Sequence, residues 1–170
     1  MENTIVNKVA QSSIVTLNLE DFLPKEPIKM FDLKDFLFMG LILKEKDYRA
    51  ALETFNWVAY ENKNVAITCS ADAIVPMWAY MLAAHYLQPI ANTIAFGNEE
   101  EIKNELLVNS IKDINAEEYL DKRVVVKGCG EQPISTKAYV AITTKLKPVV
   151  KSIMYGEPCS TVPIYKKGKV

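Results

Sequence analysis

The chain has 170 residues, 49% of them hydrophobic and 24% charged, and its 20 basic and 21 acidic side chains leave a net charge of -1. These values are typical of one soluble globular domain and disfavour a second independent core. They also disfavour nucleic acid as a partner, because nucleic-acid-binding proteins usually carry a basic excess on one face. The single histidine, His85, excludes metal sites that need two imidazoles from one chain.

The first half of the chain predicts an extended arm followed by short helices. Residues 14–19 alternate as an edge strand does, and two prolines then interrupt regular structure. Helices are expected over 33–39, capped by Asp32, and over 44–55. The amino terminus lacks the pattern of a secretory signal, so a cytoplasmic location is expected. The longest apolar run, 73–84, is too short to span a membrane.

Three strand–helix units are expected after residue 64. The strands are predicted at 65–69, 91–96 and 124–127, and the helices at 71–87, from Asn98 to about Ile114, and from about Ser135. Pro76 indicates that the first of these helices begins later than Ser70 or bends. The apolar stripe of the last helix runs through Pro148 to Ile153, which implies one kinked helix or two nearly collinear pieces, with a stop at Gly156.

Successive strand–helix units require crossover connections, which are right-handed. The predicted class is therefore α/β: a small parallel or mixed sheet of three to five strands, flanked by helices in a Rossmann-like three-layer architecture. We see no internal repeat and no linker, so one domain is expected over residues 1–170. In it, residues 1–30 form the arm, and residues 156–170 pack on the body or on a partner chain.

Three cysteines are the main candidates for chemistry. Cys69 ends the first strand of the parallel set, and Cys129 follows the third. The carboxyl ends of parallel strands share one edge, so these thiols can share a ligand if their strands are neighbours, which the sequence does not decide. A following helix start would stabilise a Cys69 thiolate, although a buried cysteine is more often a small apolar filler. Cys159 lies in an apolar segment that is able to return it toward the other two.

Small and acidic residues near these thiols complete the predicted site. Glycines on both sides of Cys129 leave the backbone open to a ligand, and Glu131 or Glu157 is able to complete a three-thiolate cluster. His85 is expected far from this edge. The candidate metal ligands are Cys69, Cys129 and Cys159, and the candidate ligand-contacting residues are Ser70, Gly128, Gly130 and Glu131. Thiolates suit zinc, iron or cuprous copper.

Three segments of the sequence resemble one known family. They are residues 69–76 with Trp78, the Gly128–Gly130 turn, and residues 154–163. Together they are similar, over nearly the whole chain, to the bacterial family catalogued as domain of unknown function 2480. The resemblance assigns no activity. It implies a context of iron–sulfur assembly, with sulfur or metal handling and assembly proteins as partners.

Two functions of different classes are therefore expected. The first is a thiol site that binds zinc or iron, or handles iron–sulfur clusters or persulfide. The second is a non-catalytic interaction module whose cysteines are packing residues and whose carboxyl-terminal segment assembles a homo-oligomer. An enzyme that binds an anionic small molecule at the helix starts after Cys69 and Gly97 is a third alternative, with no substrate-specific residue in its favour. Neither a nucleic-acid nor a membrane partner is expected.

Overall fold

The chain divides into two compact units. The structure is a computed structural model, and it describes residues 14–128, 130–157 and 160–168. Unit 1 comprises Met1–Leu23 and Asn104–Val170, and unit 2 comprises Pro24–Lys103. In sequence, unit 2 is therefore inserted between the two parts of unit 1.

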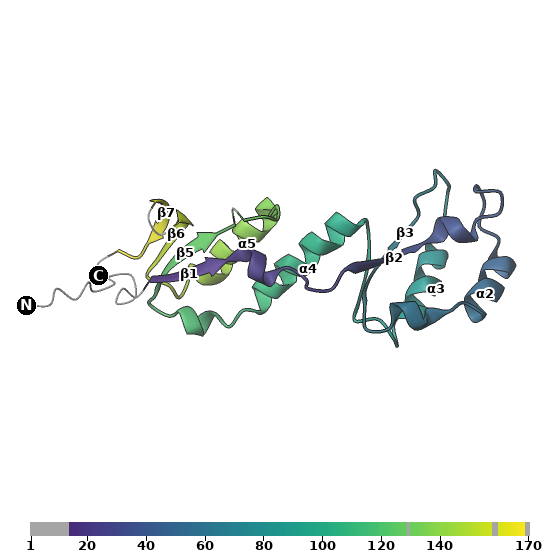
Figure 1. Cartoon of the computed structure of the whole chain (residues 1–170), viewed down its shortest axis with the longest axis horizontal. Coiled ribbons are helices and arrows are strands. Elements are labelled where there is room, and N and C mark those ends of the chain that lie inside the picture. Colours follow the sequence, from purple (N-terminus) through teal and green to yellow (C-terminus); the bar gives the residue numbers. More distant parts are fainter. Residues whose placement is uncertain (1–13, 129, 158–159, 169–170) are drawn as a thin grey trace, which may run out of the picture. The chain divides into compact units, whose positions relative to one another are not determined.

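Unit 2 is a three-stranded parallel sheet with its helices on one face (Figure 1). Its elements are β2 (Ile28–Asp32), the 3-10 helix η2 (Leu33–Phe36), α2 (Glu45–Glu53), η3 (Trp57–Tyr60), β3 (Asn64–Thr68), α3 (Met77–Leu87) and β4 (Thr93–Phe96). The strand order is β2-β3-β4, so both right-handed crossovers advance in one direction and place α2 and α3 on the same face. Val65 and Ile67 of β3 pack in the core there. The buried Tyr48 hydroxyl of α2 donates to the Ala79 carbonyl of α3 at 3.2 Å.

Unit 1 contains a four-stranded mixed sheet. Its elements are β1 (Ile14–Asn18), η1 (Leu19–Phe22), most of α4 (Glu99–Asp113), η4 (Ala116–Tyr119), β5 (Arg123–Lys127), α5 (Thr136–Leu146), β6 (Ser152–Glu157) and β7 (Ser160–Lys166). The order is β1-β5-β6-β7, and only β7 runs antiparallel to its neighbour. Leu107 and Ile111 of α4 and Ile142 of α5 pack on Val124 and Val126 of β5.

The two units repeat one fold, so the expectation of no internal repeat is wrong. A shift of 59 residues carries η3 onto η4, β3 onto β5 and α3 onto α5, from first residue to last. The opening strand and 3-10 helix, residues 14–22 and 28–36, follow a separate shift of 14 residues. The turn before β3 and β5 is also the same, because Asn62 and Asp121 have φ of 56° and 53°. Their N–H groups donate to equivalent carbonyls, those of Ile90 and Val149, at 2.8 and 2.9 Å.

The sequence identities between the units fall where the fold needs them. Residues 56–97 and 115–156 are identical at ten of 42 positions, which by itself is weak similarity. The shared residues include Asn56 and Asn115, whose side chains each accept the backbone N–H two positions ahead. They also include Gly97, which directly follows β4, and Gly156, which lies in β6. Their φ angles are 147° and 120°, respectively. In unit 2 the ten are Asn56, Tyr60, Lys63, Val65, Ala79, Tyr80, Leu87, Pro89, Ile94 and Gly97.

The α/β class is confirmed, and the strands expected in one sheet form two. Asn98 and Glu101 cap α4 as expected, each side chain accepting the other's backbone N–H at 2.9 Å. Helix α3 begins at Met77, so of the two alternatives that Pro76 indicates, a start later than Ser70 is right and a bend is not. The expected helix through Pro148 is wrong: α5 ends at Leu146, and Ile153 lies in β6. Proline has no N–H to continue a helix.

None of the described helices has the length and apolar character that crossing a bilayer requires.

Candidate functional site

Cys69 follows the last residue of β3 in unit 2. Its side chain is partly exposed, and its Sγ lies 3.8 Å from the Ala71 carbonyl oxygen, to which the thiol donates. Among the residues that the structure describes, no three histidine, cysteine or acidic side chains gather as metal ligands would. Cys129 and Cys159 lie outside the described residues. The sequence leaves open whether the strands preceding Cys69 and Cys129 are neighbours, and the structure shows that they are not, because β3 and β5 belong to different sheets.

The Asp32 side chain stabilises the turn that contains Ser70 through hydrogen bonds. Its Oδ1 accepts the backbone N–H groups of Lys34 and Ser70, both at 3.0 Å. Burial alone would raise the pKa of Asp32, but hydrogen bonds from Ser70 and Lys34 and the charge of Lys34 outweigh it and hold the pKa below its ordinary value. The predicted ligand residue Ser70 therefore has a structural partner in the strand beside it.

The two glycines beside Cys129 are in close contact with side chains of unit 1. A Cβ at Gly128 would overlap the phenol oxygen of Tyr139, and one at Gly130 would overlap the carboxylate of Glu20. The same carboxylate accepts the Gln132 N–H at 2.9 Å. Packing thus explains why both positions lack a side chain. The third predicted contact of this turn, Glu131, is exposed.

An aromatic pair recurs at the carboxyl end of both sheets. In unit 2, Tyr80 meets Phe96 edge-on with ring centroids 5.4 Å apart, and in unit 1 the equivalent Tyr139 and Tyr155 are 5.7 Å apart. Burial raises the pKa of Tyr80, and the nearby Cys69 and Asp32 add to the effect. A raised phenol pKa keeps Tyr80 protonated and hence a donor rather than a base at neutral pH. His85 is exposed on α3, with its ring 5.5 Å from that of Tyr86.

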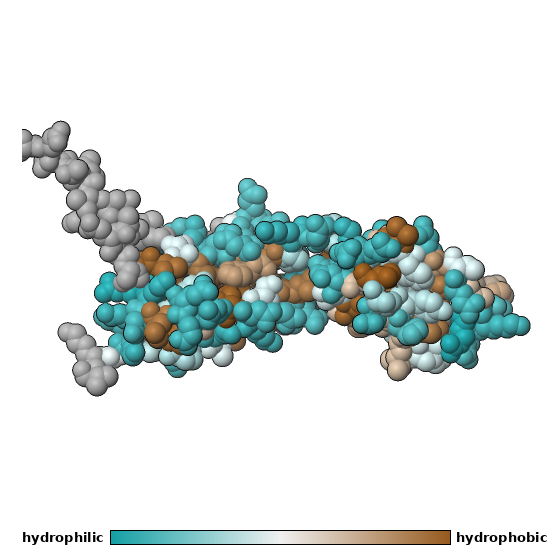
Figure 2. Space-filling model, turned by 90° about the horizontal axis from the view of Figure 1, so that it is seen from below, coloured by the Kyte–Doolittle hydropathy of each residue, from teal (hydrophilic) through white to brown (hydrophobic). Residues whose placement is uncertain are grey.

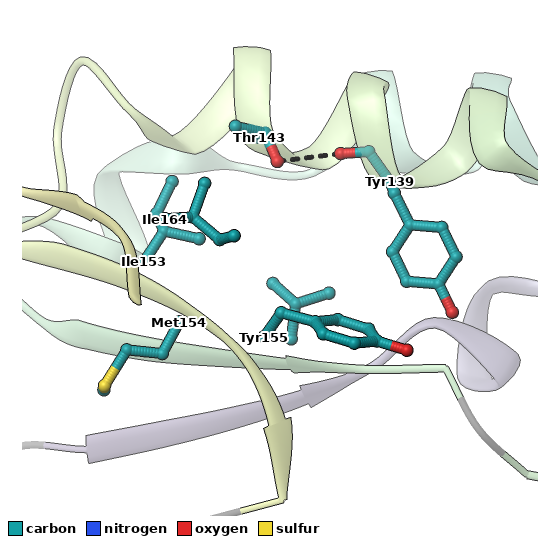
Figure 3. A pocket seen from close by; sticks show the side chains of 7 residues that line it. Tyr139, Thr143, Ile153, Met154, Tyr155 and Ile164 are labelled. Atoms are coloured by element: carbon teal, nitrogen blue, oxygen red, sulfur yellow. Dashed lines mark hydrogen bonds between the residues drawn. The ribbon is translucent and has the colours of Figure 1, made fainter. Parts of the chain in front are cut away.

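Unit 1 has an apolar pocket between α5 and the β6–β7 hairpin, with a volume of about 270 Å³. Figure 3 shows Tyr139 and Thr143 on α5, facing side chains of β6 and Ile164 of β7. The Thr143 hydroxyl donates to the Tyr139 carbonyl at 2.8 Å. The pocket is lined by Val126, Tyr139, Thr143, Ile153, Met154, Tyr155 and Ile164. Within the described part of the chain, its lining includes no acidic, basic or thiol group, so these residues offer shape and apolar surface rather than acid–base chemistry.

Unit 2 exposes large apolar side chains near the same end of its sheet. Phe96 of β4, Met77 and Met81 of α3, and Ile74 before α3 are all exposed. Figure 2 shows apolar patches of this kind interrupting the hydrophilic surface on the face drawn. The site predicted from the sequence is centred on thiols and therefore does not include Phe96. The signal for Phe96 is the segment Thr93–Phe96, a strand with two β-branched residues, one aromatic residue and no charge.

The comparisons with known proteins agree with the motifs that the sequence carries. The model of the family described as "Protein of unknown function (DUF2480)" matches residues 3–167. No curated protein and no solved structure matches the chain. The family match includes both units and all three resembling segments, 69–78, 128–130 and 154–163. The chain therefore belongs to the DUF2480 family of proteins of unknown function.

Proposed function

We propose that unit 2 is a non-catalytic interaction module that binds an extended segment of a partner protein as an added strand along β4. The supporting observation is a difference between the two units. In unit 1, β6 pairs with the antiparallel strand β7. In unit 2, β4 is the equivalent strand, and no strand among the described residues pairs with its outer edge. Adding a strand to a free sheet edge is a common way to bind a peptide.

The backbone of β4 has groups directed at this edge. The Gly97 N–H donates to the Ile67 carbonyl of β3 at 3.2 Å. The backbone N–H and C=O groups of every second residue before Gly97 therefore also point toward β3. Hydrogen-bonding groups alternate along a strand, and those of Ile94 and Phe96 therefore point outward. These are the equivalents of Ile153 and Tyr155, which pair with β7.

Side-chain exposure supports the same conclusion. Ile153 is 1% exposed, whereas the equivalent Ile94 is only partly buried. Tyr155 is 36% exposed and Phe96 is 71% exposed. An apolar strand laid along β4 would cover Ile94 and Phe96 from water, which stabilises the complex by about 25 cal/mol per Å² of apolar area buried.

Two other edge strands, β7 and β2, carry residues that discourage pairing with a further strand. Strand β7 contains Pro163 and ends in Lys166. Strand β2 contains Lys29, and Pro27 lies directly before its first residue, Ile28. Prolines and lysines are common protection against edge-to-edge association. Strand β4 has neither, and the edge strand β1 (Ile14–Asn18) of unit 1 also lacks both.

A peptide with the sequence of β7, residues 160–167, is the natural probe, because β7 occupies the equivalent place in unit 1. We expect the labelled peptide to bind the full chain in the micromolar range by fluorescence anisotropy. Phe96→Pro, which removes one outward N–H, should weaken binding at least about tenfold. Phe96→Ala, which keeps that N–H, should weaken it less. Val58→Ala, at another exposed apolar position of unit 2, should leave binding unchanged.

Hydrogen exchange locates the bound peptide. Binding should slow exchange of the Ile94 and Phe96 amides and leave that of Ala95, which faces β3, unchanged. Failure of the peptide to bind, or binding that survives Phe96→Pro, would contradict the proposal. If the wild-type chain self-associates and Phe96→Pro abolishes this self-association, the segment bound along β4 would come from a second copy of this chain and not from a partner protein.

A thiol function, as expected from the sequence, is a separate proposal. It is favoured by the position of Cys69 at the carboxyl end of β3, where the side chain is partly exposed beside Tyr80. Its chemistry would be the binding of zinc or iron, or the transfer of a persulfide's outer sulfur to a thiol of an iron–sulfur assembly protein. Elemental analysis of the untagged chain and of Cys69→Ser tests it, and metal content that Cys69→Ser leaves unchanged would count against Cys69 as a ligand.

A further inference from the structure

Cations gather at the amino edge of the parallel strands in unit 1. Arg123 begins β5, Lys151 precedes β6, and Lys166 and Lys167 lie at the end of the antiparallel β7. These four side chains line one pocket of about 450 Å³, here called the cationic pocket. Its other lining residues are Ile14, Ser152, Met154, Pro163 and Tyr165, so no acidic side chain among the described residues lines it.

Strand register brings these distant residues together. Arg123 pairs with Ser152, and Ser152 pairs with Lys166. Directly paired residues point to the same face of a sheet, and neighbouring strands lie about 4.8 Å apart. Arg123 and Lys166 therefore flank the buried Ser152 at a separation of roughly 10 Å. A group with several anionic oxygens fits between two cations so spaced.

Most of this positive charge has no described counter-charge. Lys167 pairs with Asp121 at 3.3 Å. Within the described ranges, Arg123, Lys151 and Lys166 form no ion pair. Lys147 adds a further cation, with its Nζ 5.8 Å from the centre of the Tyr165 ring. Like charges held close together repel each other, and a bound anion relieves that repulsion.

The fold itself does not require cations here, as the other unit demonstrates. The residues of unit 2 equivalent to Arg123, Lys151 and Lys147 are Asn64, Asn92 and Gln88, all neutral. The Asn92 side-chain amide donates to the Asn64 side-chain carbonyl at 2.9 Å, so the two satisfy each other. The same strand starts thus carry a neutral pair in one unit and, in the other, an Arg and a Lys that form no ion pair with the described residues. The shared architecture does not account for that difference.

We infer that the cationic pocket binds a small molecule that carries a phosphate or polyphosphate group. The planar guanidinium of Arg123 suits two phosphate oxygens, and the lysines supply charge around it. The volume lies within the range typical of small-molecule sites. Ile14, Met154 and Pro163 provide an apolar wall for the uncharged part of the ligand. This inference is independent of the strand-binding function of unit 2.

Pyrophosphate is the probe for the test, with calorimetric titration of the full chain as the measurement. The key variant is the double substitution Arg123→Asn and Lys151→Asn, which copies the neutral pair of unit 2 and should therefore fold. We expect it to bind pyrophosphate at least about tenfold more weakly than the wild-type chain. The double substitution Lys112→Asn and Lys137→Asn removes the same charge from helices of unit 1 and should change binding less than about twofold. Lys166→Gln, on another strand, should weaken binding as well.

Several results would overturn the inference. One is the absence of saturable pyrophosphate binding at low salt. Another is equal weakening in both double variants, which would reduce the effect to net charge. A third is tight binding of a single-stranded oligonucleotide with no measurable binding of pyrophosphate, which would make the surface a nucleic-acid interface instead. Binding that falls with added salt in the wild-type chain, and less steeply in the Arg123 and Lys151 variant, supports it.

Discussion

Gly128→Ala tests whether this glycine serves packing or ligand access. A Cβ at Gly128 would overlap the Tyr139 phenol oxygen, and two ring carbons would lie 2.7 and 3.0 Å from it. Carbon atoms pack at roughly 3.5–4.0 Å, so the ring must retreat by about 1 Å. Overpacking of this kind destabilises a protein by about 1–3 kcal/mol. We expect the lower half of that range, because the pocket beside Tyr139 leaves the ring space to move.

A double-mutant cycle identifies the contact responsible. Tyr139→Phe removes the overlapping oxygen but keeps the ring carbon at 2.7 Å, so it should relieve only part of the cost of Gly128→Ala. The expected coupling free energy is about 0.5–1 kcal/mol, measured from urea unfolding followed by circular dichroism. Cys69→Ala is the matched control, because unit 2 already has a Cβ at the equivalent position. A Gly128→Ala variant as stable as the wild-type chain would refute packing as the reason for the glycine.

Three further substitutions test the structure in other places. Asp32→Ala should destabilise the chain by about 1 kcal/mol, since it removes the acceptor for two backbone N–H groups. Although burial opposes the effect, the pKa of Asp32 is lowered, so this stabilisation is present above pH 4 or so and fades as the pH falls through the depressed pKa. The urea midpoints of variant and wild type should therefore converge in acid, and a constant gap would contradict this. Tyr48→Phe loses the hydrogen bond to Ala79 and should cost about 1 kcal/mol in the same assay. Gly156→Ala places a Cβ 2.6 Å from the Ser160 carbonyl oxygen at a φ of 120°, and a thermal midpoint equal to the wild type would exclude the expected loss of about 1–3 kcal/mol.

The sequence predicted individual elements better than their assembly. The strands at 64–68, 93–96 and 123–127 and the capping pair before α4 were visible because local chemistry determines them. Whether strands share a sheet depends on contacts between segments far apart in the chain, which local patterns do not report. The sequence predicts a later end for helix α5 because Val149, Val150 and Ile153 continue its apolar spacing. In the structure they serve a turn and a strand.

Recognition of the repeat would have corrected that error. Pro89 ends the helical region in unit 2, and Pro148 occupies the equivalent position in unit 1. The repeat is hard to see because its identities are scattered over caps, turns and core positions. Its first strand and 3-10 helix are also displaced: residues 14–22 precede the whole of unit 2, whereas the rest of unit 1 follows it.

The candidate sites were missed for a different physical reason. Charge summed over the whole chain is -1, which conceals cations at 123, 151 and 166–167 that meet only through strand register. The thiols were conspicuous in the composition, yet only Cys69 lies among the described residues. A total charge therefore describes the average surface, whereas a binding site depends on where a fold places a few side chains.

Comparison of the two units separates what the fold needs from what a function needs. Both retain the aromatic pair at the carboxyl end of the sheet, the capped 3-10 helix and the positive-φ turn, so these features belong to the architecture. The units differ at the outer edge, where β7 pairs with β6 of unit 1, and at the strand starts, where unit 1 has Arg123 and Lys151 in place of Asn64 and Asn92. Among the described residues, an edge with no partner strand carries a risk of aggregation, and a cluster of cations with a single ion pair carries a cost of repulsion. Because one copy of the fold avoids each cost, its presence in the other copy is best explained by binding: a polypeptide strand at β4 and a phosphate group at Arg123.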